Sequence, residues 1–170
     1  MWKFAILAAV AAATAPHATV VAASKWHIED QLSQLDEPQT MMADLDSTNK
    51  LPDDVGSLEA ATLFVQCERG ALSVYVVWPP FMGGDNRDMQ WKFDDGPVTK
   101  QSWMGSVLGT TTYDPTPYDF LAGLAAAKRF AIDASLPKQD DTKAMFDTTG
   151  ADKIVAAALD ACPKPSRPDH

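Results

Sequence analysis

The sequence predicts a mainly β protein: an antiparallel β-sandwich or meander with two short helices and a single disulfide. Three observations predict this class. Apolar and polar residues alternate with period two through the middle of the chain, turn-forming residues recur at short intervals, and the apolar spacing becomes helical after residues 116 and 149. Short strands with turns between them are typical of sandwiches and barrels.

The N-terminal segment is typical of a secretory signal peptide. Lys3 precedes an apolar run at residues 4–15, and the small residues at 21–23 suit signal-peptidase cleavage. We therefore predict a signal peptide at residues 1–23 and a single exported β-rich domain at residues 24–162. No later run of the sequence reaches the roughly 20 apolar residues of a membrane helix, so no membrane span is expected after cleavage.

The segment before residue 60 is the least regular part of the expected domain. Trp26 and Ile28 begin a first expected strand, and residues 40–45 form a second. From Asp44 to Ser57 the turn formers Asn, Pro, Asp and Gly are frequent, which predicts a loop.

The middle of the chain predicts a series of strands. Residues 63–67 and 72–78 alternate apolar and polar side chains, and Glu68–Gly70 between them predicts a hairpin turn. Pro79 and Pro80 end the second of these strands because proline cannot donate to a sheet ladder. Asp94–Pro97 is expected to turn through a positive φ at Gly96. Further strands are expected at residues 89–93, 98–106, 109–113, 130–136 and 144–147.

Two helices are predicted where the period changes. Thr116 and Pro117 suit the N-cap and first position of a helix that runs to about residue 128, before the penultimate strand. Thr149 is expected to cap the C-terminal helix. Residues 163–170 are expected to form a disordered tail. The inward face of the C-terminal helix is expected to carry Val155, Ala158, Leu159 and Cys162.

The only two cysteines of the sequence, Cys67 and Cys162, are expected to form a disulfide. An exported chain meets an oxidising compartment, where such a bridge persists. It would close a loop of about 95 residues and contribute about 2–4 kcal/mol to stability. The alternative is a reactive or intermolecular thiol pair, although the sequence lacks the C-x-x-C spacing of redox motifs.

The charge of the chain excludes some partners. The formal net charge is −9 at pH 7, with the acidic residues spread along the chain. Phosphate backbones and anionic lipids repel an acidic protein, so nucleic acids and membrane surfaces are not expected partners. The sequence carries no phosphate loop and no dinucleotide motif, so no cofactor is expected.

Residues suited to catalysis or metal binding are scarce. After signal removal the only histidines are His27 and His170, so a Ser-His-Asp site would have to use His27. Zinc lacks ligands if the cysteines are paired. A calcium loop that begins at Asp44 would need Gly and Glu where Asn49 and Val55 stand; a looser calcium site in the acidic loops is the alternative. Asp94 and Asp95 are explained by turn formation. We expect neither an enzyme nor a metal site; a carboxylate pair assembled from distant loops stays open.

The candidate contact residues are aromatic and cationic. Trp78 and Trp91 fall on apolar faces and are expected in the core, whereas Trp103 is the least obviously buried tryptophan. Aromatic side chains beside the loops at 83–88 and 114–117 would suit a ligand groove. The candidates for ligand or partner contact are Trp103, Tyr113, Lys92 and Arg69.

An ordered series of sequence blocks resembles a known family. The blocks are Thr62–Cys67, Val74–Trp78, Trp91–Asp94, Ser102–Trp103, Phe146–Gly150 and Ala161–Cys162. Their order and spacing are similar to those of the VasI group of exported proteins associated with type VI secretion. The resemblance implies an exported β domain without established enzymatic chemistry. The chain departs from the family pattern at Gln66 and Lys92, where the family has arginine, which lysine does not replace at a bidentate site.

Three functions follow as expectations. The first is a non-catalytic accessory or protein-binding module, periplasmic or secreted, which contacts an envelope protein through strand edges, loops or an apolar patch and serves an envelope secretion apparatus. The second is a β-sandwich that binds a glycan or another small ligand. The third is a hydrolase that uses loop carboxylates.

Overall fold

The computed structural model describes residues 25–31, 40–134 and 142–165. The predicted signal peptide, the expected turn at 137–141 and residues 166–170 of the expected tail lie outside this part. The strands are β1 (His27–Gln31), β2 (Thr40–Pro52), β3 (Leu58–Glu68), β4 (Ala71–Val77), β5 (Arg87–Phe93), β6 (Thr99–Gly105), β7 (Thr111–Tyr113), β8 (Arg129–Ala134) and β9 (Ala144–Asp147). The helices are α1 (Pro117–Leu124) and α2 (Ala151–Ala161).

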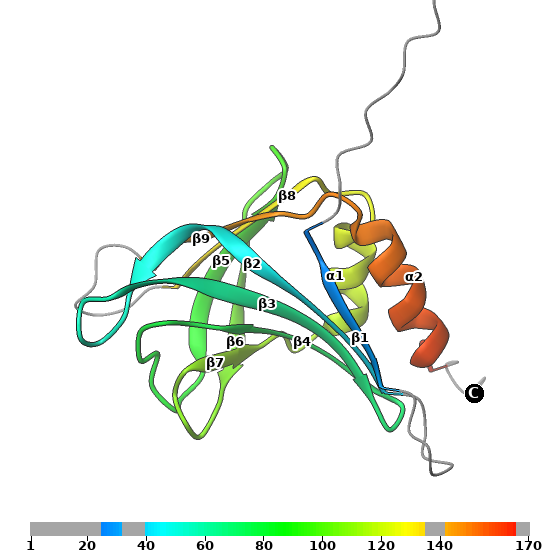
Figure 1. Cartoon of the computed structure of the whole chain (residues 1–170), viewed down its shortest axis with the longest axis horizontal. Coiled ribbons are helices and arrows are strands. Elements are labelled where there is room, and N and C mark those ends of the chain that lie inside the picture. The colour runs from blue at the N-terminus through cyan, green and yellow to red at the C-terminus, as the bar shows by residue number, and fades with distance from the viewer. Residues whose placement is uncertain (1–24, 32–39, 135–141, 166–170) are drawn as a thin grey trace, which may run out of the picture.

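The strands form one curled, antiparallel sheet with both helices at one end (Figure 1). The strand order is β1-β2-β3-β4-β7-β6-β5-β8-β9, so the sheet departs from a simple meander where β4 pairs with β7 and β5 pairs with β8. The predicted class is confirmed: a mainly antiparallel β fold with one helix before the penultimate strand and one at the C-terminal end.

The curl of the sheet brings β9 against the second half of β2. The β2–β3 register shifts between Asp46 and Lys50. Within this bulge, the Asn49 side-chain amide donates to the carbonyl of Lys143 at 2.8 Å and accepts from the N–H of Met145 at 2.9 Å. The side-chain amide of Asn49 therefore makes the two hydrogen bonds to β9 that a backbone pair would otherwise make. We call this contact the β2–β9 junction. Because β2 extends to Pro52, the predicted loop at 44–57 is wrong as far as that residue.

Helix α1 packs its buried side chains, Phe120, Leu121 and Leu124, into the core enclosed by the curled sheet. Phe120 is fully buried, and its ring centroid lies 5.1–6.1 Å from those of Trp91, Phe93, Trp103 and Phe130. Trp103 is also fully buried, so the expectation that it is the least buried tryptophan is wrong. The alternation of β6 places position 103 on the inner face of the sheet. The helix ends at Leu124, before the predicted boundary.

Helix α2 is tied to the sheet by the predicted disulfide. Cys67 on β3 and Cys162, which follows α2, are bonded with their Cα atoms 5.8 Å apart. The buried face of α2 includes Ile154, Val155 and Ala158. Leu159 is exposed, contrary to the prediction, because the face centred on residues 151, 154, 155 and 158 leaves position 159 at its margin.

Two predictions of local backbone geometry fail. The Thr149 hydroxyl donates to the Asp147 carboxylate at 2.7 Å instead of capping α2, whose N-cap is Gly150 with φ of 88°. In the turn after β5 the positive φ belongs to Asp94, at 46°, and not to Gly96. Asp tolerates the left-handed region more readily than most residues, and the Asp94 carboxylate is held there by the backbone N–H groups of Lys128 and Arg129.

Candidate functional site

The four predicted contact residues lie in four different environments. Trp103 is in the core, Tyr113 is half-buried on the outer face of the sheet, and Lys92 lines a groove. Arg69 is exposed in the β3–β4 hairpin turn, with φ of 51°. The structure therefore does not bring these four residues together in one site.

Tyr113 belongs to a row of aromatic rings across β3, β4 and β7. Phe64 pairs with Tyr75, and Tyr75 pairs with Tyr113, with ring centroids 4.9 and 5.1 Å apart. Burial, followed by the nearby Tyr113, raises the pKa of Tyr75. The rings of Phe64 and Tyr75 are stacked, with an interplanar angle of 12°, so each covers one face of the other.

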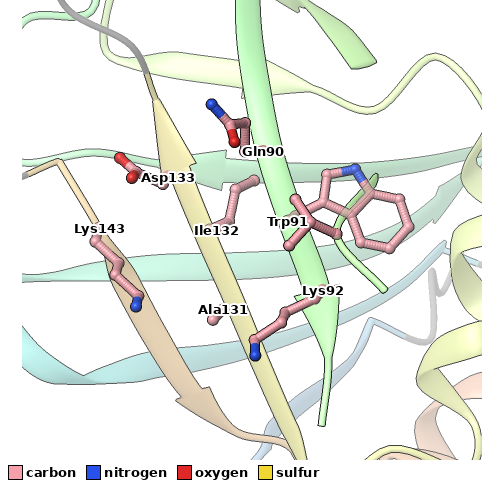
Figure 2. Close-up of a pocket in the computed structure, with 8 residues that line it drawn as sticks. Gln90, Trp91, Lys92, Ala131, Ile132, Asp133 and Lys143 are labelled. Atoms are coloured by element: carbon pink, nitrogen blue, oxygen red, sulfur yellow. The ribbon is translucent and has the colours of Figure 1, made fainter. Parts of the chain in front are cut away.

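Lys92 lies in a groove on the outer face of β5, β8 and β9. Lys92 pairs with Ala131, and Ala131 pairs with Met145. The methyl group of Ala131 leaves space between its longer neighbours, and the resulting hollow has a volume of about 580 Å³. We call it the lysine groove; its cationic side chains are Lys92, Lys128, Arg129 and Lys143. An adjoining hollow of about 140 Å³ shares Lys92, Ala131 and Lys143 with it (Figure 2).

The acids at one end of the lysine groove are held by local hydrogen bonds. The Asp94 carboxylate accepts the backbone N–H groups of Lys128 at 3.1 Å and Arg129 at 2.9 Å. Both oxygens of Asp95 accept from the Arg129 guanidinium at 3.1 Å. These carboxylates therefore join the β5–β6 turn to the start of β8.

The third acid of the lysine groove is also engaged. Asp147 accepts from the Thr149 hydroxyl and forms an ion pair with Lys25 at 3.4 Å. The hydrogen bond from the Thr149 side chain is the main cause that lowers the pKa of Asp147. In contrast, three ammonium groups form no hydrogen bond or ion pair with the described residues: those of Lys92, Lys128 and Lys143.

A second surface lies at the end of the sheet away from the helices, where three loops meet (Figure 1). Asp54, in the β2–β3 turn, accepts the N–H of Phe81 at 3.1 Å. The N–H of Met82, in the same β4–β5 loop, donates to the carbonyl of Gly109 at 2.5 Å. Gly109 has φ of 72°, and the Phe81 ring occupies the space that a side chain at position 109 would need. The β2–β3, β4–β5 and β6–β7 loops are therefore in direct contact.

These loops expose large apolar side chains. Five of them form what we call the apolar loop end, and their exposed fractions are Val55 86%, Leu58 61%, Phe81 55%, Val107 100% and Leu108 82%. Single exposed apolar residues are common on soluble proteins, whereas a group of them marks an interaction surface. The same loops carry the exposed acids Asp54 and Asp85. The apolar loop end is therefore an apolar surface beside negative charge.

The sequence reasoning missed most of both surfaces. In the lysine groove it identified Lys92 alone, although Arg129, Ala131 and Asp133 alternate with buried residues along β8. That alternation is the available signal for an outward face, but it does not show that β8 and β9 lie beside β5. At the apolar loop end, Val107 and Leu108 follow directly after the predicted strand at 98–106, and two adjacent aliphatic residues in a turn are the available signal.

The described residues contain no group of three or more His, Cys, Asp or Glu side chains placed to hold a metal ion. His27, the sequence candidate for a catalytic base, is exposed, with its Nδ1 3.2 Å from the Asp44 carboxylate. Neither α1 nor α2 is long and apolar enough to cross a membrane.

Comparisons with known proteins identify the fold but not a family. No family model and no curated protein matches the chain, and the resemblance to the VasI group stays a prediction. Among solved structures, the fold is similar to the crystal structure of invasion associated protein B from Bartonella henselae, at 12% identity and a TM-score of 0.53. The match covers 81% of this chain and 93% of that one. At this identity the likeness establishes a shared architecture of curled sheet and helices, and nothing more.

Proposed function

We propose that the protein is an exported, non-catalytic accessory module that binds a partner protein of the cell envelope through the apolar loop end. The observation that carries this proposal is the gathering of five exposed apolar side chains: four are on three loops in direct contact, and Leu58 is the first residue of β3. Exposing apolar surface to water is unfavourable by about 25 cal/mol per Å². A surface of this kind suits a binding partner that covers it.

The chemistry of the apolar loop end defines the partner. Val107 and Leu108 project from a hairpin turn, so they suit insertion into an apolar pocket. Asp54 and Asp85 beside them favour a pocket with basic residues at its rim. The same acids, together with the net charge of −9, disfavour an anionic membrane surface.

The compartment is proposed on three grounds. A disulfide between Cys67 and Cys162 is compatible with the oxidising environment outside the cytoplasm. The resemblance to the VasI group favours a periplasmic or secreted protein beside a secretion apparatus. The fold neighbour is named an invasion associated protein, and a role for this chain at the surface of a bacterium would agree with that name.

The test is a pair of matched variants. V107D/L108D introduces charge at the apolar loop end, and V98D does so at another turn, where the valine is 56% exposed. Each purified protein is immobilised and incubated with envelope extract, and the retained protein is identified and quantified. We expect one protein to be retained by the wild type and by V98D, and to fall at least about tenfold with V107D/L108D. Urea unfolding should be similar for all three.

Two results would contradict the proposal. Equal retention by V107D/L108D and V98D would show that another surface binds the partner. If light scattering instead shows that the wild type forms a dimer, and that V107D/L108D is a monomer, the apolar loop end pairs with a second copy of this chain and the envelope-partner proposal is wrong.

A further inference from the structure

We propose that the lysine groove is a binding site for an organic anion of metabolite size, which places a carboxylate or phosphate group between the ammonium groups of Lys92 and Lys143. The site uses none of the residues of the apolar loop end, so this inference stands apart from the proposed function. It rests on the shape of the groove, on two ammonium groups that form no ion pair with the described residues, and on an apolar floor.

The shape follows from the register of three strands. Lys92 and Lys143 lie on either side of β8, because β8 pairs with β5 on one side and with β9 on the other. Ala131 pairs with Met145, so Lys143 is offset by two residues from the row of Lys92. Two strand spacings and this offset separate their backbones by about 12 Å. Figure 2 shows both side chains turning toward Ala131. A volume of about 580 Å³ is in the range of small-ligand sites.

The lysine groove has four cationic side chains and three acids. The adjoining hollow adds Asp133, whose carboxylate accepts from the hydroxyl of Thr142 at 3.2 Å. The acids of the lysine groove are occupied by the backbone of β8, by Arg129 and by Lys25, as described above. The ammonium groups of Lys92 and Lys143 have no such partner within the described residues. Two ammonium groups that point into one hollow repel each other, and an oxyanion between them removes that repulsion and forms charge-assisted hydrogen bonds.

The floor indicates the rest of the ligand. Ala131 lies on β8 between the two lysines, and the exposed Met145 beside it extends the apolar floor. Toward the other end, the ammonium group of Lys128, which forms no ion pair with the described residues, would meet a second acidic group. The ligand therefore combines at least one oxyanion with a neutral or apolar body, and a second oxyanion increases its affinity.

The experiment compares two double variants of equal charge. K92Q/K143Q removes the proposed contacts, and K50Q/K153Q removes two exposed lysines that form no ion pair with the described residues. The probes are glutarate, pyrophosphate and the uncharged glutaramide. Binding is followed by calorimetry and by the chemical shifts of the Ala131 and Met145 methyl groups, with unfolding curves to show that every variant folds.

We expect glutarate or pyrophosphate to bind the wild type and K50Q/K153Q equally, and to bind K92Q/K143Q at least about tenfold more weakly. The stronger of the two probes identifies the group as carboxylate or phosphate. Glutaramide should not bind. An equal loss in both double variants would show a non-specific charge effect and overturn the inference. So would an unchanged affinity in K92Q/K143Q, or no binding of either anion by the wild type up to about 10 mM.

Discussion

The two ends of the curled sheet differ in the burial of their apolar side chains. At the helical end, α1 and α2 bury their apolar faces against the strands, and a disulfide holds α2 in place. At the loop end, Val107 and Leu108 are almost fully exposed. The fold covers one end with its own helices, and the other end carries the proposed partner surface.

The comparison teaches how to separate stability from binding in this molecule. A buried aromatic residue contributes its transfer free energy and its packing contacts to the folded state. An exposed aromatic residue contributes less to folding, and at the loop end we propose that it contacts a partner instead. Variants at the helical end should therefore change unfolding, and variants at the loop end should change binding.

The largest effect is expected from one phenylalanine at each end. Phe120→Ala removes a fully buried ring that contacts four other aromatic rings, and should lower the free energy of unfolding by about 3–5 kcal/mol. Phe81→Ala removes a ring that is 55% exposed and packs on Gly109, and should lower the free energy of unfolding by only about 1 kcal/mol. Urea unfolding measures both. Similar losses in the two variants would refute the contrast between the ends.

The disulfide is expected to have the next largest effect. C67A/C162A should lower the free energy of unfolding by about 2–4 kcal/mol, because the bridge closes a long loop in the unfolded chain. Below the unfolding transition, retention of the envelope partner should be unchanged, since the bridge lies at the helical end. A loss of retention in folded C67A/C162A would mean that the two ends are coupled.

The sequence predicts features that depend on the period of one strand or on a single possible pairing, and it does not predict which face of an irregular strand is buried. Alternation over residues 63–67 and 72–78 predicted β3 and β4, because one face of each strand is buried and the period of a strand is two. The cysteine pair was predictable because only one pairing exists within the chain. The burial of Trp103 could not be predicted, because its neighbours Ser102 and Met104 do not indicate which face of the strand lies against the core.

The lysine groove and the β2–β9 junction could not be predicted, for a different reason. Both depend on strands that are distant in sequence and adjacent in space. Asn49 is typical of a turn, and only the position of β9 shows that its side chain bonds a second strand. Lys143 lines the same groove as Lys92 only because β5, β8 and β9 are neighbours in the sheet. Sequence patterns describe the face of a strand, but they do not specify its neighbour.

An intermediate effect is expected at the β2–β9 junction, which lies outside both ends. Asn49→Ala removes two hydrogen bonds to β9 and should lower the free energy of unfolding by about 1–2 kcal/mol. Asn86→Ala, at an exposed position of the β4–β5 loop, is the matched control and should change it by less than about 0.5 kcal/mol. Hydrogen exchange at the Met145 amide should accelerate in Asn49→Ala alone. Unchanged exchange would mean that the junction does not protect β9.

The smallest effect is expected from Asp114, which lies just before α1. Burial raises the pKa of this carboxyl, although hydrogen bonds from the backbone and side chain of Thr116 oppose the shift. Because the native state then holds the proton more tightly than the unfolded state, stability is present at low pH and is lost as the pH rises from the ordinary pKa of 3.8 through the raised value. The loss should be smaller in Asp114→Asn.

Thermal unfolding followed from about pH 3 to pH 7 measures this dependence. Asp85→Asn, at an exposed position of the loop end, should keep the slope of the wild type. If Asp114→Asn also keeps the wild-type dependence of stability on pH, the proton held by Asp114 does not contribute to that dependence.

The bridge from Cys67 to Cys162 has a topological consequence. It makes a covalent ring of the chain from β3 to the end of α2, and both the β4–β5 and β6–β7 loops lie within that ring. A protease that cuts at Val107 opens the ring but separates no fragment, because the two pieces stay joined through sulfur. New chain termini can therefore be introduced at this turn while every strand of the sheet remains on one covalent molecule.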